Sequence, residues 1–449
     1  MKKIFIAFMS LAFLCVSCAG FGQNQAAQLD TLMQAYTSLN KFNGTLLVTK
    51  NGKVLLNKGY GYRNLANRVL HDKNSVFQIG SVTKQFTTTI ILKLQAEKKL
   101  SVQDPISKYF PQYPKGDSIT IENLMLHTSG IYNYTNDRTF MQNEVTKPAN
   151  MEKMMAMFKD NPLGFTPGKG WSYSNSAYLL LGYIIESVTK KPYEQIVHDY
   201  IFKPLKMTHS GFDFTHLQDK YKSTGYFAVT EKDTIPSTIV DSSVSFSAGA
   251  IYSTTEDLLR WHQGLLKNIV LTNAQQEKAY TPVKNHYGYG WSIDSVYGKR
   301  VLSHGGGIHG FTSNFSRLPA DDVCIVLLSN ASSGGLSKIT NDIYAILYNK
   351  PYEVPRARKA IVLAEDKLKQ YIGEYTINER LNLVIELKGS ELIATPTNQR
   401  PAVLHPEKED NFFVKEPDIQ LKFTRNDKQE IDGFILFQNG AEVKCPKIK

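Results

Sequence analysis

Ser81 and Lys84 form a Ser-x-x-Lys tetrad whose residue types could carry out nucleophilic catalysis. At the start of a helix, residues three positions apart share one face, so the lysine amine would lie beside the serine hydroxyl. A partly buried lysine can have a lowered pKa and accept the hydroxyl proton. The helix N-terminus adds positive potential where an oxyanion would form. The tetrad therefore predicts a serine nucleophile with a nearby amine.

The same Ser-x-x-Lys pattern begins at Ser38 and at Ser187, so the spacing alone does not identify the nucleophile. Ser38 precedes a predicted hairpin, and Ser187 falls near the end of a predicted amphipathic helix. Ser81 follows a predicted strand and a glycine and opens a helix. Because a strand-to-helix junction exposes a nucleophile, the context favours Ser81.

Tyr173 and Asn175 form a Tyr-x-Asn pair directly before a second long predicted helix. A tyrosine hydroxyl can relay a proton to a leaving group, and an asparagine amide can hold a substrate carbonyl. Tyr134 and Asn136 repeat the pair, and either copy could be a turn with an aromatic anchor. Tyr173 is preferred because the helix follows it at once.

His304 is followed by Gly305, Gly306 and Gly307, directly after a predicted strand. These glycines would let a substrate backbone approach an exposed edge strand, and a backbone N–H could complete an oxyanion hole. The alternatives are a glycine-rich turn, or the oxyanion loop of an α/β-hydrolase lipase, whose Gly-x-Ser-x-Gly elbow the sequence lacks. His304 and His309 have no carboxylate neighbours at metal-binding spacing, so we expect no metal and no cofactor.

The elements that must position these residues are strands at both ends of the first 350 residues and helices between them. Strands are expected in a hairpin over 42–60 and at 75–79, 288–291, 300–303, 310–315 and 323–328. Helices are expected over 26–41, from 81, from 175, over 256–266 and over 337–347. This order predicts an α+β fold with one antiparallel sheet flanked by helices.

The predicted secondary structure changes after residue 350. Residues 351–365 break the pattern and are typical of a linker. Residues 366–449 show short strands only, which predicts a small all-β barrel or sandwich. No nucleophile or metal cluster is evident there, so we expect a structural or accessory role.

Composition excludes several classes of protein. The 449 residues include 42% hydrophobic and 21% charged side chains, which excludes wholesale disorder. A mean hydropathy of −0.28 excludes a polytopic membrane protein. The formal net charge of +11 comes from scattered Lys and Arg residues, so nucleic-acid binding is not expected.

The N-terminus is typical of an export signal over residues 1–22. Two lysines precede an apolar run over 4–16, and small residues follow. Cys18 could instead be the lipid-modified first residue of a lipoprotein, although Cys15 replaces the usual leucine three residues earlier. We therefore expect an exported, periplasmic protein that contacts the membrane only if Cys18 carries lipid.

The three motifs occur in one order, with spacings of about 90 and about 130 residues. That combination resembles the serine β-lactamase and penicillin-binding-protein superfamily, in particular its class C β-lactamase and DD-carboxypeptidase branch. The stretches 126–131, 247–254 and 287–291 are also similar to signatures of that branch. The resemblance implies a β-lactamase/transpeptidase-like hydrolase domain over 23–350. The C-terminal domain is similar to the small lipocalin-like β-domain often appended to such proteins.

The resemblance also implies roles for the motif residues. Ser81 would be the acylated nucleophile and Lys84 its proton acceptor. Tyr173 would act as a base together with Lys84 and would protonate the leaving group. Asn175 would position the acyl amide. His304 would orient Tyr173 electrostatically. Whether the lysine or the tyrosine is the base stays open in such sites.

The glycines carry the substrate-binding roles and one departure from the family. The resemblance implies an oxyanion hole made by the backbone N–H groups of Ser81 and Gly307, with Gly306 beside it. The family's third motif often reads Lys-Thr-Gly or His-Thr-Gly, and its threonine hydroxyl holds a substrate carboxylate. Gly305 takes that place here, and losing a hydrogen bond to a charged group costs about 1.5–3 kcal/mol. We therefore expect an esterase, peptidase or amidase rather than an efficient β-lactamase.

Together these features predict an exported serine hydrolase (EC 3) that acts through an acyl-enzyme on an ester or amide, either a peptide or a β-lactam-like compound. Expected substrates are small molecules or peptides, cell-wall fragments among them. The alternative from another class is a non-catalytic envelope-binding or sensor protein on a penicillin-binding fold. The intact polar residues of the three motifs favour the enzyme.

Overall fold

The computed structural model describes residues 24–229, 234–332, 336–415, 419–438 and 441–449. They divide into two compact units. The first holds the described residues up to Leu336 together with Ile343–Val354, and the second holds Ser337–Asp342 and Pro355–Lys449. The predicted signal peptide, including Cys18, lies outside the described residues.

The first unit is built on one antiparallel six-stranded sheet in the order β2-β1-β12-β11-β10-β9. Its strands are β1 (Gly44–Lys50), β2 (Lys53–Tyr60), β9 (Ser292–Val296), β10 (Lys299–Ile308), β11 (Phe311–Leu318) and β12 (Val323–Ser329). The N-terminal hairpin joins strands from far along the chain, because Leu47 of β1 lies opposite Val326 of β12. The predicted single sheet made from both ends of this region is therefore confirmed.

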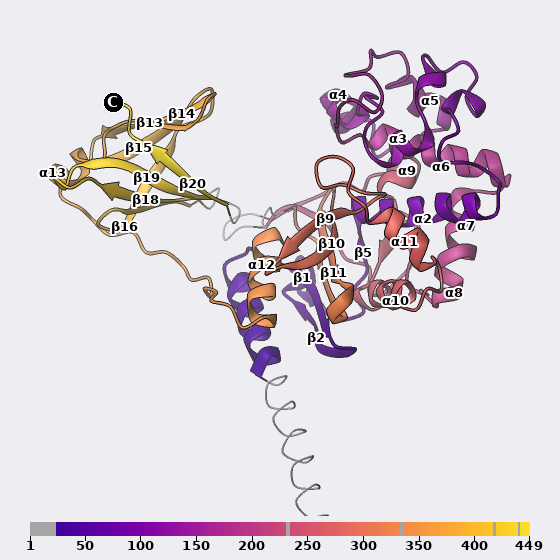
Figure 1. Ribbon diagram of the computed structural model, residues 1–449. Coiled ribbons are helices and arrows are strands. Elements are labelled where there is room, and N and C mark those ends of the chain that lie inside the picture. Colours follow the sequence, from indigo (N-terminus) through magenta and orange to yellow (C-terminus); the bar gives the residue numbers. More distant parts are fainter. Residues whose placement is uncertain (1–23, 230–233, 333–335, 416–418, 439–440) are drawn as a thin grey trace, which may run out of the picture. The chain divides into compact units, whose positions relative to one another are not determined.

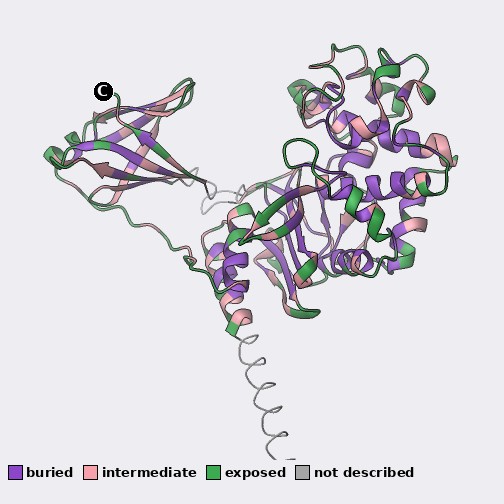
Figure 2. Ribbon diagram, viewed as in Figure 1, coloured by how far each residue is buried: buried purple, intermediate pink, exposed green. Residues whose placement is uncertain are grey.

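The β1–β2 hairpin shows how local sequence fixes this sheet. Asn51 and Gly52 form its turn with φ of 51° and 73°. A two-residue hairpin turn needs left-handed backbone at both positions, which Asn-Gly supplies at low cost. Every residue of β12, the strand that receives β1, is buried. Figure 2 shows the same burial along the middle of the sheet.

Helices cover both faces of the sheet (Figure 1). A helix over 24–38 and α12 (Leu336–Leu347) lie on one face, where Gln25 donates to the carbonyl oxygen of Ile346 at 3.1 Å. On the other face lie α2 (Thr83–Ala96) and α10 (Thr255–Leu266), with α6 (Asn175–Thr189) and α9 (Ser242–Gly249) packed on α2. No helix within the described ranges is long and apolar enough to cross a bilayer.

Shorter elements complete this unit. The short strands are β3 (Tyr62–Asn64), β4 (Val69–Leu70), β5 (Phe77–Gln78), β6 (Tyr226–Val229), β7 (Thr234–Pro236) and β8 (Tyr252–Ser253). The short helices are α3 (Ile121–Met125), α4 (Arg138–Asn143), α5 (Met151–Ala156), α7 (Tyr193–Val197), α8 (Lys203–Leu205) and α11 (Asn273–Ala279).

Residues 288–291 were expected to form a strand, and this prediction is wrong because they form a loop against α2. Gly290 has φ of 75°, and a Cβ there would lie 2.8 Å from the carbonyl oxygen of Lys84. Thr88 of α2 donates to the carbonyl oxygen of Tyr289 at 2.9 Å. The glycines in this alternating pattern therefore allow the loop to pack closely on α2, and the pattern does not reflect a β-strand.

The three glycines after His304 lie inside β10 and not in a turn. Gly306 pairs with Ser313 of β11, and the pairing continues on both sides of it. On the opposite side of β10, the pairing with β9 ends at Ser303. Within the described residues, the segment 304–308 is therefore an open strand edge.

The second unit is an antiparallel eight-stranded sheet whose strands follow one another in sequence order. After α13 (Glu365–Lys369) come β13 (Gly373–Asn378), β14 (Leu381–Lys388), β15 (Glu391–Pro396), β16 (Ala402–Lys408), β17 (Asn411–Val414), β18 (Ile419–Arg425), β19 (Ile431–Gln438) and β20 (Ala441–Pro446). Tyr375 of β13 bridges to Lys447, directly after β20, so the sheet nearly closes on itself. The predicted all-β barrel is confirmed.

Candidate active site

Ser81 lies where a short strand turns into a long helix. β5 pairs with β8, a 3-10 turn over Gly80–Val82 follows, and α2 begins at Thr83. Gly80 has φ of 52°, a conformation that favours glycine. Ser81 is half-buried whereas Val82 and the first turn of α2 are buried. The Ser81 side chain therefore reaches solvent from a backbone that the core holds in place.

The Nζ atom of Lys84 contacts three oxygen atoms. It lies 3.1 Å from Ser81 Oγ. Nζ also donates to Asn175 Oδ1 at 2.8 Å and to the carbonyl oxygen of Ala248 at 2.8 Å. All three partners are uncharged, and the lysine side chain is fully buried.

Burial lowers the pKa of the Lys84 amine well below its usual value, because the charged form is desolvated. A neutral amine has two hydrogens and one lone pair. The two hydrogens fit the oxygens of Asn175 and Ala248, which leaves the lone pair for the hydroxyl of Ser81. Lys84 is thus set to accept the Ser81 proton.

Tyr173 precedes the N-cap of α6. Ser174 is that N-cap, and its Oγ accepts the N–H of Ala177 at 3.3 Å. Burial raises the pKa of the Tyr173 phenol, and its hydrogen bond with the Ser81 side chain opposes the rise only in part. The phenol therefore keeps its proton at neutral pH and holds it next to Ser81. Lys84 Nζ lies 4.8 Å from the centre of the same ring.

Asn175 is the first residue of α6 and is held from several directions. Its backbone N–H donates to Asn133 Oδ1 at 3.0 Å, and its Nδ2 donates to Thr135 Oγ1 at 3.3 Å. These bonds turn Oδ1 toward Lys84. One Nδ2 hydrogen remains for a substrate carbonyl.

His304 is neutral and has a partner at each ring nitrogen. Nδ1 lies 2.6 Å from the carbonyl oxygen of Gly305, and Nε2 lies 2.8 Å from the hydroxyl of Tyr287. A carbonyl only accepts, so the proton is assigned to Nδ1, and Nε2 accepts from Tyr287. Burial and the nearby Lys84 amine lower the pKa of His304 to about 4, although its bond to Gly305 opposes this. Its ring centre lies 6.2 Å from that of Tyr173.

The backbone of β10 lies against the junction that carries Ser81. A Cβ on Gly80 would lie 2.8 Å from the nitrogen of Gly307, and a Cβ on Gly306 would lie 2.0 Å from the carbonyl oxygen of Ile79. Gly307 itself is exposed, with no atom within 4 Å of where its Cβ would be. The N–H groups of Ser81 and Gly307 thus belong to two backbones in close contact, as an oxyanion hole requires.

The repeated motifs found in the sequence lie elsewhere. Ser38 ends the helix over 24–38, and its hydroxyl donates to the carbonyl oxygen of Ala35 at 2.9 Å. Ser187 is in the last turn of α6. Tyr134 is buried and donates to the carbonyl oxygen of Val244 at 3.0 Å, which is a structural role. The structure therefore gathers Ser81 with the residues of the other two preferred motifs.

Three residues of this site were not predicted from the sequence. Ala248 supplies the carbonyl that Lys84 contacts, Tyr287 donates to His304, and His127 packs on Tyr173 with ring centres 4.2 Å apart. Each lies in one of the stretches 247–254, 287–291 and 126–131, which the family resemblance singled out without giving roles. Their presence in those stretches was the available signal.

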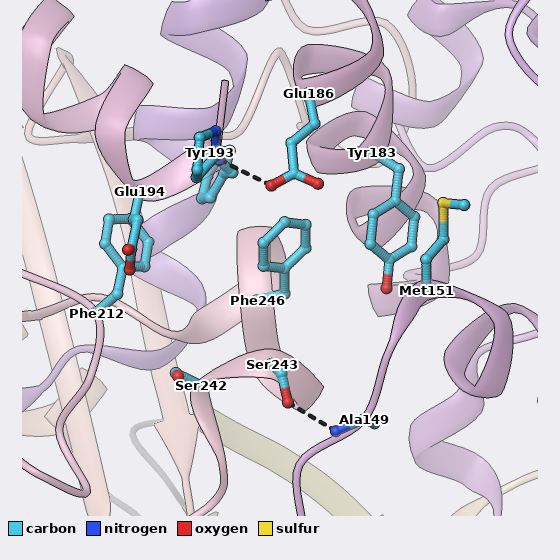
Figure 3. A pocket seen from close by; sticks show the side chains of 11 residues that line it. Ala149, Met151, Tyr183, Glu186, Tyr193, Glu194, Phe212, Ser242, Ser243 and Phe246 are labelled. Atoms are coloured by element: carbon cyan, nitrogen blue, oxygen red, sulfur yellow. Dashed lines mark hydrogen bonds between the residues drawn. The ribbon is translucent and has the colours of Figure 1, made fainter. Parts of the chain in front are cut away.

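A cavity of about 290 Å³ lies apart from the predicted site residues, and none of them lines it. Figure 3 shows Tyr183 and Phe246 beside it, with the carboxylate of Glu186 accepting the backbone N–H of Tyr193 at 2.9 Å. Phe246 has φ of 35° and ψ of −130°, a strained conformation for a residue with a side chain. Two residues later, α9 presents the Ala248 carbonyl to Lys84.

Comparison with known proteins matches residues 29–350 to the family model described as Beta-lactamase. A penicillin-binding protein of Bacillus subtilis (strain 168) is 27% identical over 455 residues, which cover 95% of this chain and 100% of that protein.

Two solved structures extend the comparison. The octameric penicillin-binding protein homologue from Pyrococcus abyssi is 25% identical with a TM-score of 0.68, covering 93% of this chain and 99% of that one. A D-stereospecific amidohydrolase from Streptomyces sp. is 25% identical with a TM-score of 0.62, covering 70% of this chain and 98% of that one.

Proposed function

The chain belongs to the beta-lactamase family, and from this premise we propose that it is a serine hydrolase acting through an acyl-enzyme on an ester or amide. One observation carries the proposal: Lys84 Nζ lies 3.1 Å from Ser81 Oγ, with uncharged partners at its other two contacts. Burial lowers the pKa of this amine, which favours the neutral form that can take a proton from a hydroxyl.

In the acylation step, Ser81 Oγ forms a bond to the substrate carbonyl carbon while its proton passes to Lys84. The carbonyl oxygen becomes an oxyanion that accepts hydrogen bonds from the N–H groups of Ser81 and Gly307. The C–O or C–N bond then breaks, and the leaving group takes the Tyr173 phenol proton. Tyr173 regains a proton from Lys84, so the net transfer is from Ser81 to the leaving group.

In the deacylation step, a water oxygen bonds to the acyl carbon and its proton passes to the same base. The bond from Ser81 Oγ to that carbon breaks, and Oγ takes the proton back. The product is a carboxylic acid, and the three side chains return to their starting states. No metal or cofactor enters this scheme.

The substrate would lack a carboxylate close to the bond that is cleaved. Lys84 is buried with a lowered pKa, and His304 is neutral above about pH 4. Gly305 has no hydroxyl to offer. Of the site residues in the described part of the chain, none therefore supplies a cation to such a carboxylate. The open edge of β10 at 304–308 suits an extended, peptide-like acyl group.

The test is a substrate panel with a Ser81→Ala control. Nitrocefin, short-chain nitrophenyl esters, D-Ala-D-Ala peptides and D-amino-acid amides would be offered to the full chain. A fluorophosphonate probe should label the wild type and leave the Ser81→Ala variant unlabelled. Full hydrolysis by the variant would end the nucleophile assignment. Absence of any product burst with an activated ester would favour the non-catalytic, envelope-binding alternative.

We also propose export to the periplasm on the basis of residues 1–22. Fractionation of cells carrying the full chain, with and without Cys18→Ala, tests this. Release of the protein from the membrane fraction by the substitution would indicate a lipid anchor. Equal recovery of both forms in the soluble periplasmic fraction would indicate a cleaved signal, and a cytoplasmic location would overturn the proposal.

A further inference from the structure

We propose that His127 is a positioning residue that holds the Tyr173 phenol against Ser81. The proposal rests on the serine hydrolase function and adds a residue to it. His127 touches neither Ser81 nor a substrate position in the contacts described above. It acts on the loop that carries Tyr173.

The main evidence is that His127 accepts hydrogen bonds from both neighbours of Tyr173. The N–H of Ser172 donates to the carbonyl oxygen of His127 at 3.0 Å. The N–H of Ser174 donates to Nδ1 of the His127 ring at 3.1 Å. The backbone on either side of Tyr173 is therefore tied to one residue 46 positions earlier in the chain.

The His127 ring also fixes the Tyr173 ring by direct contact. The two ring centres lie 4.2 Å apart with an interplanar angle of 38°. Tyr178 and Tyr287 pack on the other sides of His127 at 5.0 and 4.9 Å. His127 is fully buried, so its imidazole is held in the core by these three tyrosine rings.

The tautomer of His127 follows from these contacts. A backbone N–H only donates, so Nδ1 must carry the lone pair and Nε2 must carry the proton. Nε2 is buried without a hydrogen-bond partner in the described protein, which is destabilising. Burial also lowers the pKa of this imidazole, as do Lys84 and His304. The ring is thus neutral, which the bond from Ser174 requires.

The backbone of His127 restricts what can replace it. Its φ is 59°, in the left-handed region, which few residues other than glycine and asparagine adopt readily. Asparagine also places its Oδ1 where histidine places Nδ1. His127→Asn therefore keeps the backbone conformation and the acceptor for Ser174. His127→Leu keeps the volume and loses the acceptor.

The experiment measures how each variant depends on the leaving group. Esters sharing one acyl group would be compared, a nitrophenyl ester with an alkyl ester. A poor leaving group needs the Tyr173 proton, whereas nitrophenolate does not. Tyr173→Phe gives the reference signature, which is a larger loss of kcat/KM for the alkyl ester than for the nitrophenyl ester. His127→Leu should reproduce it, with a loss in kcat/KM of about 100-fold for the alkyl ester and under about tenfold for the nitrophenyl ester. His127→Asn keeps the acceptor for Ser174 and loses the ring contact with Tyr173, so its loss on the alkyl ester should be smaller than that of His127→Leu.

Each outcome separates this proposal from the function on which it rests. If Ser81→Ala keeps its activity, the proposed function fails. If Ser81 is required and Tyr173→Phe shows the signature, but folded His127→Leu loses both activities equally or neither, the positioning role is wrong. A folded His127→Asn that behaves like His127→Leu would also overturn it.

A measurement on the wild-type protein covers the case in which His127→Leu does not fold. Nitrogen-15 NMR of the histidine rings distinguishes a protonated from an unprotonated Nδ1. The proposal requires one buried histidine with the proton on Nε2 and with Nδ1 bonded to a backbone amide. A His127 resonance with the proton on Nδ1 would contradict it.

Discussion

Gly80 and Gly307 lie so close that a Cβ on Gly80 would stand 2.8 Å from the backbone nitrogen of Gly307. This contact joins the junction that carries Ser81 to the strand β10. It sets the distance between the two N–H groups that would stabilise an oxyanion. The contact depends on the absence of a side chain at position 80.

Gly80→Ala should therefore reduce acylation more than it reduces folding. The methyl group would push β10 from Ser81, and φ of 52° would add strain of about 1 kcal/mol. We expect kcat/KM for an activated ester to fall at least about tenfold, since losing one oxyanion donor costs more than that. Gly164→Ala is the matched control, because its nearest atom is 3.8 Å from the new Cβ. Equal activity of the two variants would contradict the role of this contact.

Lys84→Arg should abolish rapid acylation because it replaces an amine that can lose its proton with a permanent cation. A guanidinium cannot lose its proton at any working pH, so it cannot act as the base. We expect the rate of fluorophosphonate labelling to fall by roughly 100-fold or more. In the wild type, the lowered pKa of Lys84 means that the labelling rate should reach its plateau well below the ordinary lysine pKa. A wild-type rate that keeps rising to about pH 10.4, the ordinary lysine pKa, would argue against Lys84 as the base.

Gly305→Thr should shift the preference toward substrates with a carboxylate next to the cleaved bond. The position is exposed, and the atom nearest to a new Cβ is 3.8 Å away. A hydroxyl there could make a hydrogen bond to the carboxylate worth about 1.5 kcal/mol or more, which is about tenfold in kcat/KM. The measurement compares a D-Ala-D-Ala peptide with its C-terminal amide. An unchanged ratio would mean that this hydroxyl does not reach the substrate.

The first unit should lose stability on acidification below about pH 6.5. Burial lowers the pKa of His71 to about 3 and of His262 and His304 to about 4. Since these rings stay neutral in the fold but take protons when unfolded below about pH 6.5, stability falls as pH falls toward 4. Each contributes up to about 1.4 kcal/mol per pH unit in that window.

Urea unfolding followed by tryptophan fluorescence measures this effect, because all three tryptophans lie in the first unit. The free energy of unfolding would be compared at pH 7.5 and pH 5.5. His71→Asn serves as the matched variant, and it should show a smaller difference between the two pH values than the wild type. Equal differences would show that His71 is not the source.

The sequence predicted the parts of the fold and the site that depend on local pattern. Ser81 and Lys84 lie one helical turn apart, so their contact needs little more than a helix at that place. The antiparallel sheet followed from strands at both ends of the first 350 residues. Residues 288–291 were misread because alternating aromatics and glycines resemble a strand until Gly290 is seen to pack on α2.

Contacts made through backbone atoms were beyond sequence reasoning. Ala248 contributes a carbonyl oxygen, which every residue type possesses, so its type gives no sign of its contact with Lys84. His127 acts on backbone N–H groups 45 and 47 residues later in the chain. Only the folded arrangement of α3, α6 and α9 brings these atoms together.

The open edge of β10 beside Ser81 would affect how selective the site is among substrates. An edge of this kind recognises the repeating amide spacing of an extended chain and takes little notice of what the chain carries at each position. Because residues 305–307 are glycines, this edge also has no side chains that would exclude a bulky substrate by steric clash. Such an edge would discriminate weakly between extended chains that differ only in their side chains.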